Sequence, residues 1–433
     1  MKHKIILLAV SLLLMQFFVE AQETRTLTLN EAIELGLKNS HLLKNHEAKI
    51  LEATANIKEA EERKLPDASI SGSYLYLPVN PTIDMKTGSG NGGGPSVHQA
   101  IYGTANVSLP LYAGGKIKYG IESAKLLEQA VKLDAENDRA SVILNITSAC
   151  INLYKAHQAI ELVKENLQQS QQRVKDLSNL EKNGLLARND LLKAELQSSN
   201  IELTLLDAES NYKLACVNMN IMMGLPEQTI LIPDKSGLAL PTSIKTIEEY
   251  EQDAIQNRKD IAAVNFRKKN ADINLKAIKA EKYPSITLTG GYVAADIPNF
   301  FSVYNAVNIG IGVKYNIASL WKNKSKIRQA EAKMKQVTES EYMLSDNIRM
   351  QINEAYQLYL VSVKKIEVYE KAITQATENY RITKNKYDNS LATTTELLEA
   401  DVALFQAKLR VTNAKADSFV AYNKLLQTAG DLK

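Results

Sequence analysis

The second half of this 433-residue chain repeats its first half, which restricts the chain to folds that duplicate one structural unit. One constant shift carries Asn183 onto Asn389, and a slightly larger shift carries Pro66 onto Pro284. Solenoid repeats are only ~20–50 residues long, whereas this repeat spans about half the chain, which indicates a duplicated unit instead. Other residues that coincide are Asn39 with Asn257, Lys64 with Lys282, Gly72 with Gly290, Tyr74 with Tyr292, Leu185 with Leu391, Ala194 with Ala400 and Gly224 with Gly430.

Both repeats predict the same order of elements: a helix, two short strands, a very long helix and a further helix. Proline ends the first helix of each repeat, at Pro66 and Pro284, because proline cannot continue the hydrogen-bond ladder. We expect a signal peptide at 1–21, a first repeat at 22–224 with helices at 28–65, 114–182 and 185–223, a linker at 225–244, and a second repeat at 245–433 with helices at 245–282, 319–388 and 391–429.

The longest helices predict helical hairpins. A helix of about 70 residues is ~105 Å long, and each one matches the two shorter helices of its repeat placed end to end. The pairing places the hairpin tips at Asn183-Gly184 and Asn389-Ser390. Apolar residues in 114–182 recur at spacings of 3, 4 and 7, as in a coiled-coil seam; they are Ile160, Val163, Leu167, Val174 and Leu177.

Four short segments alternate apolar and polar residues with a period of two, which predicts β-strands. They are 67–77, 97–109, 284–293 and 305–315. Each has about 10 residues, the length that crosses a bilayer when tilted. Four strands are too few to close a barrel, so membrane strands would require several chains, and three chains would supply twelve strands. The amphipathic sheet of a soluble protein is the alternative that fits the same alternation.

The N-terminus and the composition narrow the compartment and the function. Lys2 and Lys4 precede an apolar run from Ile5 to Val19, and Ala21 stands at the expected cleavage site. This is the pattern of a secretory signal peptide, with a single membrane anchor as the alternative. Lys plus Arg (52) nearly balances Asp plus Glu (49), so no strong basic field is present to hold a nucleic acid. The five His do not cluster as metal ligands, and the glycine-rich segment 80–96 is no phosphate loop. We therefore expect no cofactor and no enzyme activity.

The two cysteines lie at corresponding heights of the first expected hairpin. Cys150 precedes Gly184 by nearly the same stretch of chain as the one that separates Gly184 from Cys216. Packed helix axes are ~8–10 Å apart, which is usually too far for a disulfide. The spacing therefore favours two buried thiols, although an oxidising compartment leaves a disulfide open.

The hairpin tips carry a specific resemblance. The segments Lys182–Ala194 and Tyr387–Ala400 resemble the periplasmic turns of the TolC-like outer-membrane efflux protein family, the outer-membrane factors of tripartite pumps. Pro110–Gly115, the repeat and the strand pairs extend the resemblance over nearly the whole chain. It implies an α+β membrane protein and a homotrimer. Each chain would give four strands to a shared 12-stranded β-barrel, which a long periplasmic α-helical barrel of coiled-coil hairpins continues.

The resemblance also implies a function and partners. Members of the family are passive exit ducts in the outer membrane of Gram-negative bacteria, and they extend into the periplasm. They carry small molecules from an inner-membrane pump, and a periplasmic adaptor (membrane fusion) protein docks at the hairpin tips. The matching tip residues are Asn183, Gly184, Leu185, Asn389, Ser390 and Leu391.

The resemblance further implies where the duct closes. Glu396 and Glu399 match acidic residues that ring the constricted pore in the family, and their spacing of three places both on one helical face. Asp190 and Tyr387 match residues that hold the closed state. The alternative is that these residues are solvated near a helix N-terminus, where acids are favoured.

Some features of the chain leave the details open. Ala392 occupies the place of the basic residue in the closed-state network, and Arg188 is the candidate to replace it. A type I protein-secretion duct of the same fold is an alternative function. A secreted coiled-coil structural protein is an alternative from another class, but it would not explain paired strands at corresponding places in two repeats.

Overall fold

The computed structural model describes residues 24–79, 81, 96–234, 240–241 and 243–432. The expected signal peptide at 1–21 and most of the glycine-rich segment 80–96 lie outside the described residues, as do 235–239 and 242 of the expected linker. The chain forms two compact units. The hairpin unit contains the described residues up to Asn45 together with Ala135–Lys259 and the residues from Leu344 onward, and the sheet unit contains His46–Asp134 and Asp260–Met343.

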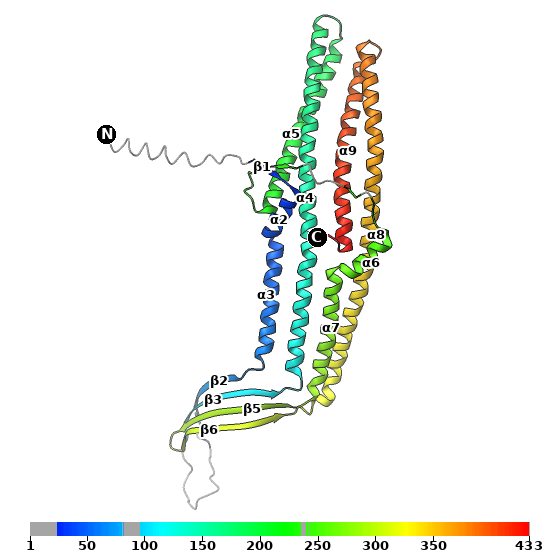
Figure 1. Cartoon of the computed structure of the whole chain (residues 1–433). Helices are drawn as coiled ribbons and strands as arrows, with labels where there is room; N and C mark the ends of the chain where they lie inside the picture. The colour runs from blue at the N-terminus through cyan, green and yellow to red at the C-terminus, as the bar shows by residue number, and fades with distance from the viewer. Residues whose placement is uncertain (1–23, 80, 82–95, 235–239, 242, 433) are drawn as a thin grey trace, which may run out of the picture. The chain divides into compact units, whose positions relative to one another are not determined.

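The hairpin unit holds two helical hairpins (Figure 1). In the first, α4 (Lys116–Lys182) turns back into α5 (Arg188–Met223), and in the second, α8 (Ser319–Asp388) turns back into α9 (Thr394–Ala429). The first parts of α4 and α8 belong to the sheet unit. The other elements of the hairpin unit are β1 (Thr24–Leu27), α2 (Leu29–Asn39), β4 (Ile230–Pro233) and α6 (Ile247–Asn257). No helix in the described part of the chain is both long and apolar enough to cross a membrane.

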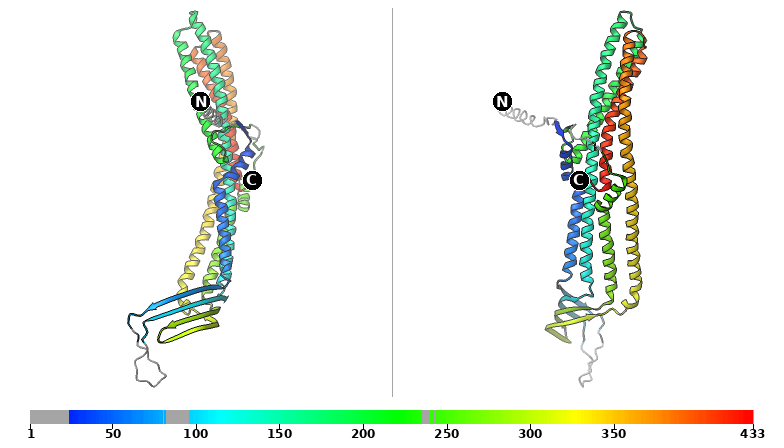
Figure 2. Two further views of the ribbon diagram at one scale, coloured as in Figure 1. Left: turned by 90° about the vertical axis from the view of Figure 1, so that its left-hand side faces the viewer. Right: turned by 45° about the vertical axis from the view of Figure 1, so that its right-hand side comes forward.

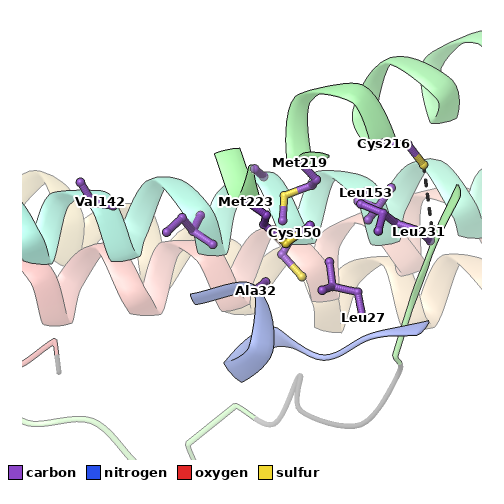
Figure 3. Packing of buried hydrophobic residues seen from close by; sticks show 11 residues of the cluster. Leu27, Ala32, Val142, Cys150, Leu153, Cys216, Met219, Met223 and Leu231 are labelled. Atoms are coloured by element: carbon purple, nitrogen blue, oxygen red, sulfur yellow. Dashed lines mark hydrogen bonds between the residues drawn. The ribbon is translucent and has the colours of Figure 1, made fainter. Parts of the chain in front are cut away.

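Side chains from β1, α2, α4, α5 and β4 form the core of the hairpin unit (Figure 3). Its fully buried members are Leu27, Ala32, Ile146, Leu153, Met219, Met223 and Leu231. Cys150 and Cys216 belong to the same core, and both are free and buried, so the preference for two thiols is confirmed. The thiol of Cys216 points at the carbonyl oxygen of Leu231, 3.9 Å away. Burial raises the pKa of Cys150 to about 11, so this thiol stays protonated at neutral pH.

The parallel pair of β1 and β4 is absent from the sequence-based expectations. Thr24 lies opposite Ile230, and Leu27 lies opposite Pro233. The hydroxyl of Tyr212 on α5 donates a hydrogen bond to the carbonyl oxygen of Leu231 at 2.7 Å. The expected linker at 225–244 therefore contains a strand that is bound to the hairpin core.

The sheet unit holds one antiparallel sheet with the strand order β2-β3-β5-β6 (Figures 1 and 2). The strands are β2 (Asp67–Tyr76), β3 (Gln99–Tyr112), β5 (Ser285–Ile297) and β6 (Phe301–Lys314). Compared with the expected 284–293 and 305–315, β5 and β6 extend further toward the turn that joins them. α3 (His41–Glu62, from His46 onward), α7 (Lys259–Lys279, from Asp260 onward), a 3-10 turn at Ala280–Lys282 and the first parts of α4 and α8 complete the unit.

The strand register gives the sheet one apolar face and one polar face. Cross-strand partners share a face, so Ile70, Ala105 and Tyr292 lie on the same side as Val307. The apolar face contains Ile70, Tyr74, Ile101, Val107, Leu109, Ile286, Leu288, Tyr292, Val307, Ile309, Ile311 and Val313. The polar face contains Ser69, Ser71, Ser73, Thr104, Asn106, Ser108, Thr287, Thr289 and Asn308. The hydroxyls of Ser71 and Thr104 are hydrogen-bonded across β2 and β3 at 2.8 Å.

The prediction of a continuous helix is wrong for two segments. The helix expected at 28–65 is divided into α2 and α3 at Ser40, and the helix expected at 245–282 is divided into α6 and α7 at Arg258. Ser40 has φ −58° and ψ 114°, and Arg258 has φ −67° and ψ 126°, so both leave the helical region. The two breaks fall at matching positions of the repeat.

Each break packs closely against a glycine that ends another helix. Gly224 and Gly430 end α5 and α9 with φ +69° and +79°, values that glycine adopts without strain. A Cβ at Gly224 would lie 2.9 Å from Cγ of Asn39, and a Cβ at Gly430 would lie 3.0 Å from the backbone nitrogen of Arg258. The side-chain amide of Asn39 also donates to the carbonyl oxygen of Met223 at 2.5 Å. In each repeat, the break between the two helices thus lies against the C-terminal end of another helix.

Candidate functional site: the hairpin tips

The first tip is closed by a glycine in the left-handed conformation. Gly184 has φ +73°, and the N–H of Leu185 donates to the carbonyl oxygen of Leu180 at 2.8 Å. This six-residue closure satisfies a carbonyl group that the end of α4 would leave without a partner. The side-chain amide of Asn183 donates to the carbonyl oxygen of Asn179 at 2.7 Å.

The second tip has the same geometry with a serine in place of the glycine. Ser390 has φ +60°, and the N–H of Leu391 donates to the carbonyl oxygen of Lys386 at 2.7 Å. The side-chain amide of Asn389 donates to the carbonyl oxygen of Asn385 at 2.7 Å. The repeat therefore produces two equivalent turns, and the second turn carries the steric strain of an L-residue at positive φ.

Each tip presents one leucine to solvent. Leu185 is 74% exposed and Leu391 is 76% exposed. The two leucines occupy matching positions directly after the residue with positive φ. An apolar side chain held outward by a rigid turn is suited to contact another protein.

The acids expected at the pore lie at the start of α9. The carboxylate of Glu396 accepts hydrogen bonds from the Thr393 N–H at 2.7 Å and the Thr393 hydroxyl at 2.9 Å, forming a capping box. The backbone N–H of Thr393, and after it the hydroxyl, lower the pKa of Glu396, so this carboxylate is charged at neutral pH. Glu399 makes no ion pair in the described part of the chain. Both side chains are exposed to solvent.

Asp190 is joined to the second hairpin through Lys193, a residue that no sequence pattern singles out. The Lys193 ammonium donates to the Asp190 carboxylate at 3.2 Å and to the Thr395 hydroxyl at 3.2 Å. Lys193 thus links α5 to α9. Arg188, the candidate for the missing basic residue, instead lies 3.9 Å from Glu181 on its own hairpin.

Tyr387 reaches from α8 into the core of the first hairpin. Its ring packs against a cluster formed by Leu177, Leu191 and Ala194. Its hydroxyl lies 3.3 Å from the hydroxyl of Thr394, the first residue of α9. The structure thus brings Tyr387 and Asp190 into two separate links between the hairpins.

A buried ion pair below the tips is a third link, and sequence reasoning missed it. Arg173 on α4 donates to Asp401 on α9 at 3.0 Å and to the Tyr380 hydroxyl on α8 at 3.4 Å. The side chains of Arg173 and Asp401 are only 11% and 6% exposed. Burial acts to lower the pKa of Arg173, but the hydrogen bond and charge of Asp401 outweigh it and raise the pKa. Asp401 lies in the buried stripe of α9 with Leu397 and Ala400. A charged residue within this stripe was the sequence signal that could have predicted a buried ion pair.

The pair of Arg173 and Asp401 belongs to a series of ion pairs along α4 and α9. Two more exposed pairs continue it away from the tips: Glu165 with Lys408 at 3.1 Å and Lys155 with Asp417 at 2.7 Å. From one ion pair to the next, the residue number decreases along α4 and increases along α9, as expected for neighbouring antiparallel helices. The seam between the hairpins therefore contains three ion pairs between α4 and α9, and Arg173–Asp401 is the most deeply buried of them.

Comparison with known proteins agrees with this architecture. The sequence model of the family described as "Outer membrane efflux protein" matches residues 32–225 and 251–431. Nodulation protein T of Rhizobium leguminosarum bv. trifolii is 23% identical over 395 residues, which cover 89% of this chain and 80% of that protein. The cation efflux system protein CusC of Escherichia coli O157:H7 is 23% identical over 410 residues, covering 91% and 83%. The crystal structure of the outer membrane protein VceC of Vibrio cholerae aligns with a TM-score of 0.75 at 19% identity, covering 93% of this chain and 96% of that one.

Paired helical hairpins together with a four-stranded antiparallel sheet give this chain the fold of the TolC-like channels. The family match covers most of the chain, and this chain belongs to the outer membrane efflux protein family. Members of the family are outer-membrane channels that extend into the periplasm and work with adaptors and inner-membrane pumps. The chain is therefore an outer-membrane exit duct of an efflux or secretion system.

Proposed function

We propose that three copies of this chain form one passive channel, with a shared twelve-stranded β-barrel in the outer membrane and the helices as a periplasmic α-helical barrel. In this proposal the channel is the outer part of a tripartite system that exports small molecules. The observation that carries the proposal is the sheet of the sheet unit, which has an uncovered apolar face and two edge strands.

The apolar face of the sheet is most exposed on the two edge strands, β2 and β6. Ile70 is 89% exposed, Ile309 is 83% exposed and Val307 is 78% exposed. The sheet of a soluble protein covers such a face with its own chain. Lipid is the environment in which a sheet of this kind keeps its apolar face outward, with the small polar residues of the other face lining water.

The two edges of the sheet favour assembly with further copies. β2 and β6 are each paired on one side only. Unpaired backbone groups cannot face lipid, so each edge requires a partner strand. Pairing β6 of one chain with β2 of the next closes a ring, and three chains of four strands reach the size of known barrels.

The tips supply the contacts that this function needs at the periplasmic end. The exposed leucines, Leu185 and Leu391, give a periplasmic adaptor two equivalent apolar contacts per chain. Glu396 and Glu399 would give two rings of acids in a trimer, which favour cations at a constriction. Asp190, through the contact of Lys193 with Thr395, and Tyr387, through its packing on Leu177 and Leu191, would hold the hairpins in the closed arrangement.

The size of the protein in detergent tests the assembly. The mature protein extracted from outer membranes is expected to have three times the mass of one chain by light scattering after subtraction of bound detergent. A monomer or dimer, or protein recovered only in the soluble fraction, would overturn the shared barrel. The helices would then belong to a secreted or periplasmic coiled coil.

A further inference from the structure

A group of basic residues lies where the sheet passes into α8. The chain turns from β6 into α8 within a few residues, because the Ser319 N–H donates to the Asn316 carbonyl oxygen at 3.0 Å. The side-chain amide of Asn323 donates to the carbonyl oxygen of Ile278 at 3.0 Å. These bonds fix the first turns of α8 against the sheet and α7.

Along this junction, apolar residues are followed by basic ones. Ile317, Leu320 and Trp321 are 60%, 55% and 60% exposed, so an apolar collar continues the apolar face of the sheet. Lys322, Lys324 and Arg328 follow, and all three are exposed. None of the three forms an ion pair within the described ranges, whereas their neighbour Lys326 is bound to Glu281 at 2.8 Å.

The other repeat carries the same arrangement. β3 ends at Tyr112 and α4 begins at Lys116, so this junction lies at the same end of the sheet. Leu111 and Tyr112 are 54% and 46% exposed. Lys116 and Lys118 are exposed, and neither has a carboxylate partner among the residues that the structure describes. In both repeats, two lysines with the spacing Lys-x-Lys thus stand at the start of the helix that follows the sheet.

The depth of these lysines matches that of lipid phosphates. Aromatic residues such as Trp321 settle at the edge of the hydrocarbon core. Lys324 lies about one helical turn further on, ~4.5 Å along the axis of α8. The headgroup region occupies ~5–8 Å beyond the core on each side. Flexible lysine side chains adjust to that depth.

We infer that the pairs Lys116/Lys118 and Lys322/Lys324 form a binding surface for the phosphate groups of anionic phospholipids in the periplasmic leaflet. The inference rests on the proposed function, because it requires the sheet to stand in the membrane. Each chain has two such lysine pairs, so a trimer would carry a ring of six lysine pairs. These lysines follow an apolar collar and have no carboxylate partner among the described residues, so an anionic bilayer surface would complement their charge.

The single tryptophan of the chain, Trp321, provides a local probe. The full-length protein is reconstituted in phosphatidylcholine bilayers that contain increasing fractions of either brominated phosphatidylglycerol or brominated phosphatidylcholine, and quenching of Trp321 fluorescence is measured. We expect phosphatidylglycerol to occupy the lipid sites at Trp321 about fivefold more readily. The preference should fall to about one in the Lys322→Gln/Lys324→Gln variant.

The chain offers a matched control on the same helix. Lys333 and Lys335 have the same spacing, are exposed, and lie ~16 Å further along α8, beyond the headgroups. The Lys333→Gln/Lys335→Gln variant should keep the preference for phosphatidylglycerol. Equal quenching by both brominated lipids, or a preference that survives in Lys322→Gln/Lys324→Gln, would overturn the inference while leaving the sheet in the membrane. Absence of quenching by either lipid would overturn the proposed function itself.

Discussion

Single residues at the tips differ in strain although their backbones match. Ser390 adopts φ +60° where the first repeat has Gly184 at +73°, and an L-residue in this region carries a cost of about 1 kcal/mol. Ser390→Gly should therefore slow hydrogen exchange of the Leu391 amide about fivefold, because the tip opens less often. Gly184→Ala should speed exchange of the Leu185 amide by a similar factor. Exchange followed by mass spectrometry over the tip peptides measures both.

A serine in regular helix gives the control for the tip variants. Ser199 lies inside α5, where glycine lowers helix stability, so Ser199→Gly should speed local exchange. Faster exchange at Leu391 in Ser390→Gly would contradict the strain argument.

The buried pair of Arg173 and Asp401 supports a second prediction at the residue scale. Asp401→Asn leaves the Arg173 guanidinium buried without a carboxylate, which should cost about 3 kcal/mol. The matched change on the same helix, Asp417→Asn, breaks a pair that is 27% and 58% exposed and should cost under about 1 kcal/mol. The midpoint of thermal loss of helical circular dichroism in detergent compares the two. Equal midpoints would mean that Arg173 finds another partner.

The candidate site was only partly predictable from its residues. Asn183, Gly184, Asn389 and Ser390 are turn formers at matching places of a repeat, so the sequence alone locates both turns. The inter-hairpin contacts of Lys193 and Arg173 depend on which helices pack together and in what register. A single sequence does not contain that register, because an exposed and a buried Arg on a long helix look alike.

At the scale of elements, the breaks in the expected helices give a further prediction. Gly430→Ala places a Cβ 3.0 Å from the backbone nitrogen of Arg258 and also forces an L-residue to φ +79°. The combined effect should exceed about 2 kcal/mol and lower the thermal midpoint. Gly184→Ala is the control, because its φ is similar and nothing lies within 4 Å of the added Cβ. Equal losses in the two variants would show that the contact with Arg258 is unimportant.

The elements themselves were predictable where local rules decide them. The long helices have no internal proline, and the strands alternate with a period of two, so periodicity finds both. No glycine or proline stands at the breaks at Ser40 and Arg258, which lie against Gly224 and Gly430 from distant parts of the chain. The strands β1 and β4 are very short, and they pair although β1 lies at the start of the first repeat and β4 lies in the expected linker, beyond the reach of any local pattern.

At the scale of the whole molecule, the proposed acidic rings predict ion selectivity. Glu396 and Glu399 lie one turn apart on the exposed side of α9, so a trimer would carry six carboxylates at one constriction. In planar bilayers under a KCl gradient, Glu396→Gln/Glu399→Gln should lose the cation preference of the native channel. The variant Glu195→Gln/Glu202→Gln, which removes two acids from α5, should keep it. Unchanged selectivity and conductance in Glu396→Gln/Glu399→Gln would discard the gate.

The capping box makes the selectivity depend on pH in a defined direction. Hydrogen bonds from the Thr393 N–H and hydroxyl lower the pKa of Glu396 below its ordinary value of 4.5. A carboxylate with a lowered pKa keeps its charge at pH 4.5 and loses it only as the pH falls through the lower value. Glu399→Gln channels, in which Glu396 alone supplies the ring, should therefore stay cation-selective at pH 4.5. Thr393→Ala in the Glu399→Gln background removes the hydroxyl donor to Glu396 but keeps the backbone donor. As the pH falls, this variant should lose its cation selectivity at a higher pH than the Glu399→Gln channel. Loss at the same pH would show that the capping hydroxyl does not affect the charge of the ring.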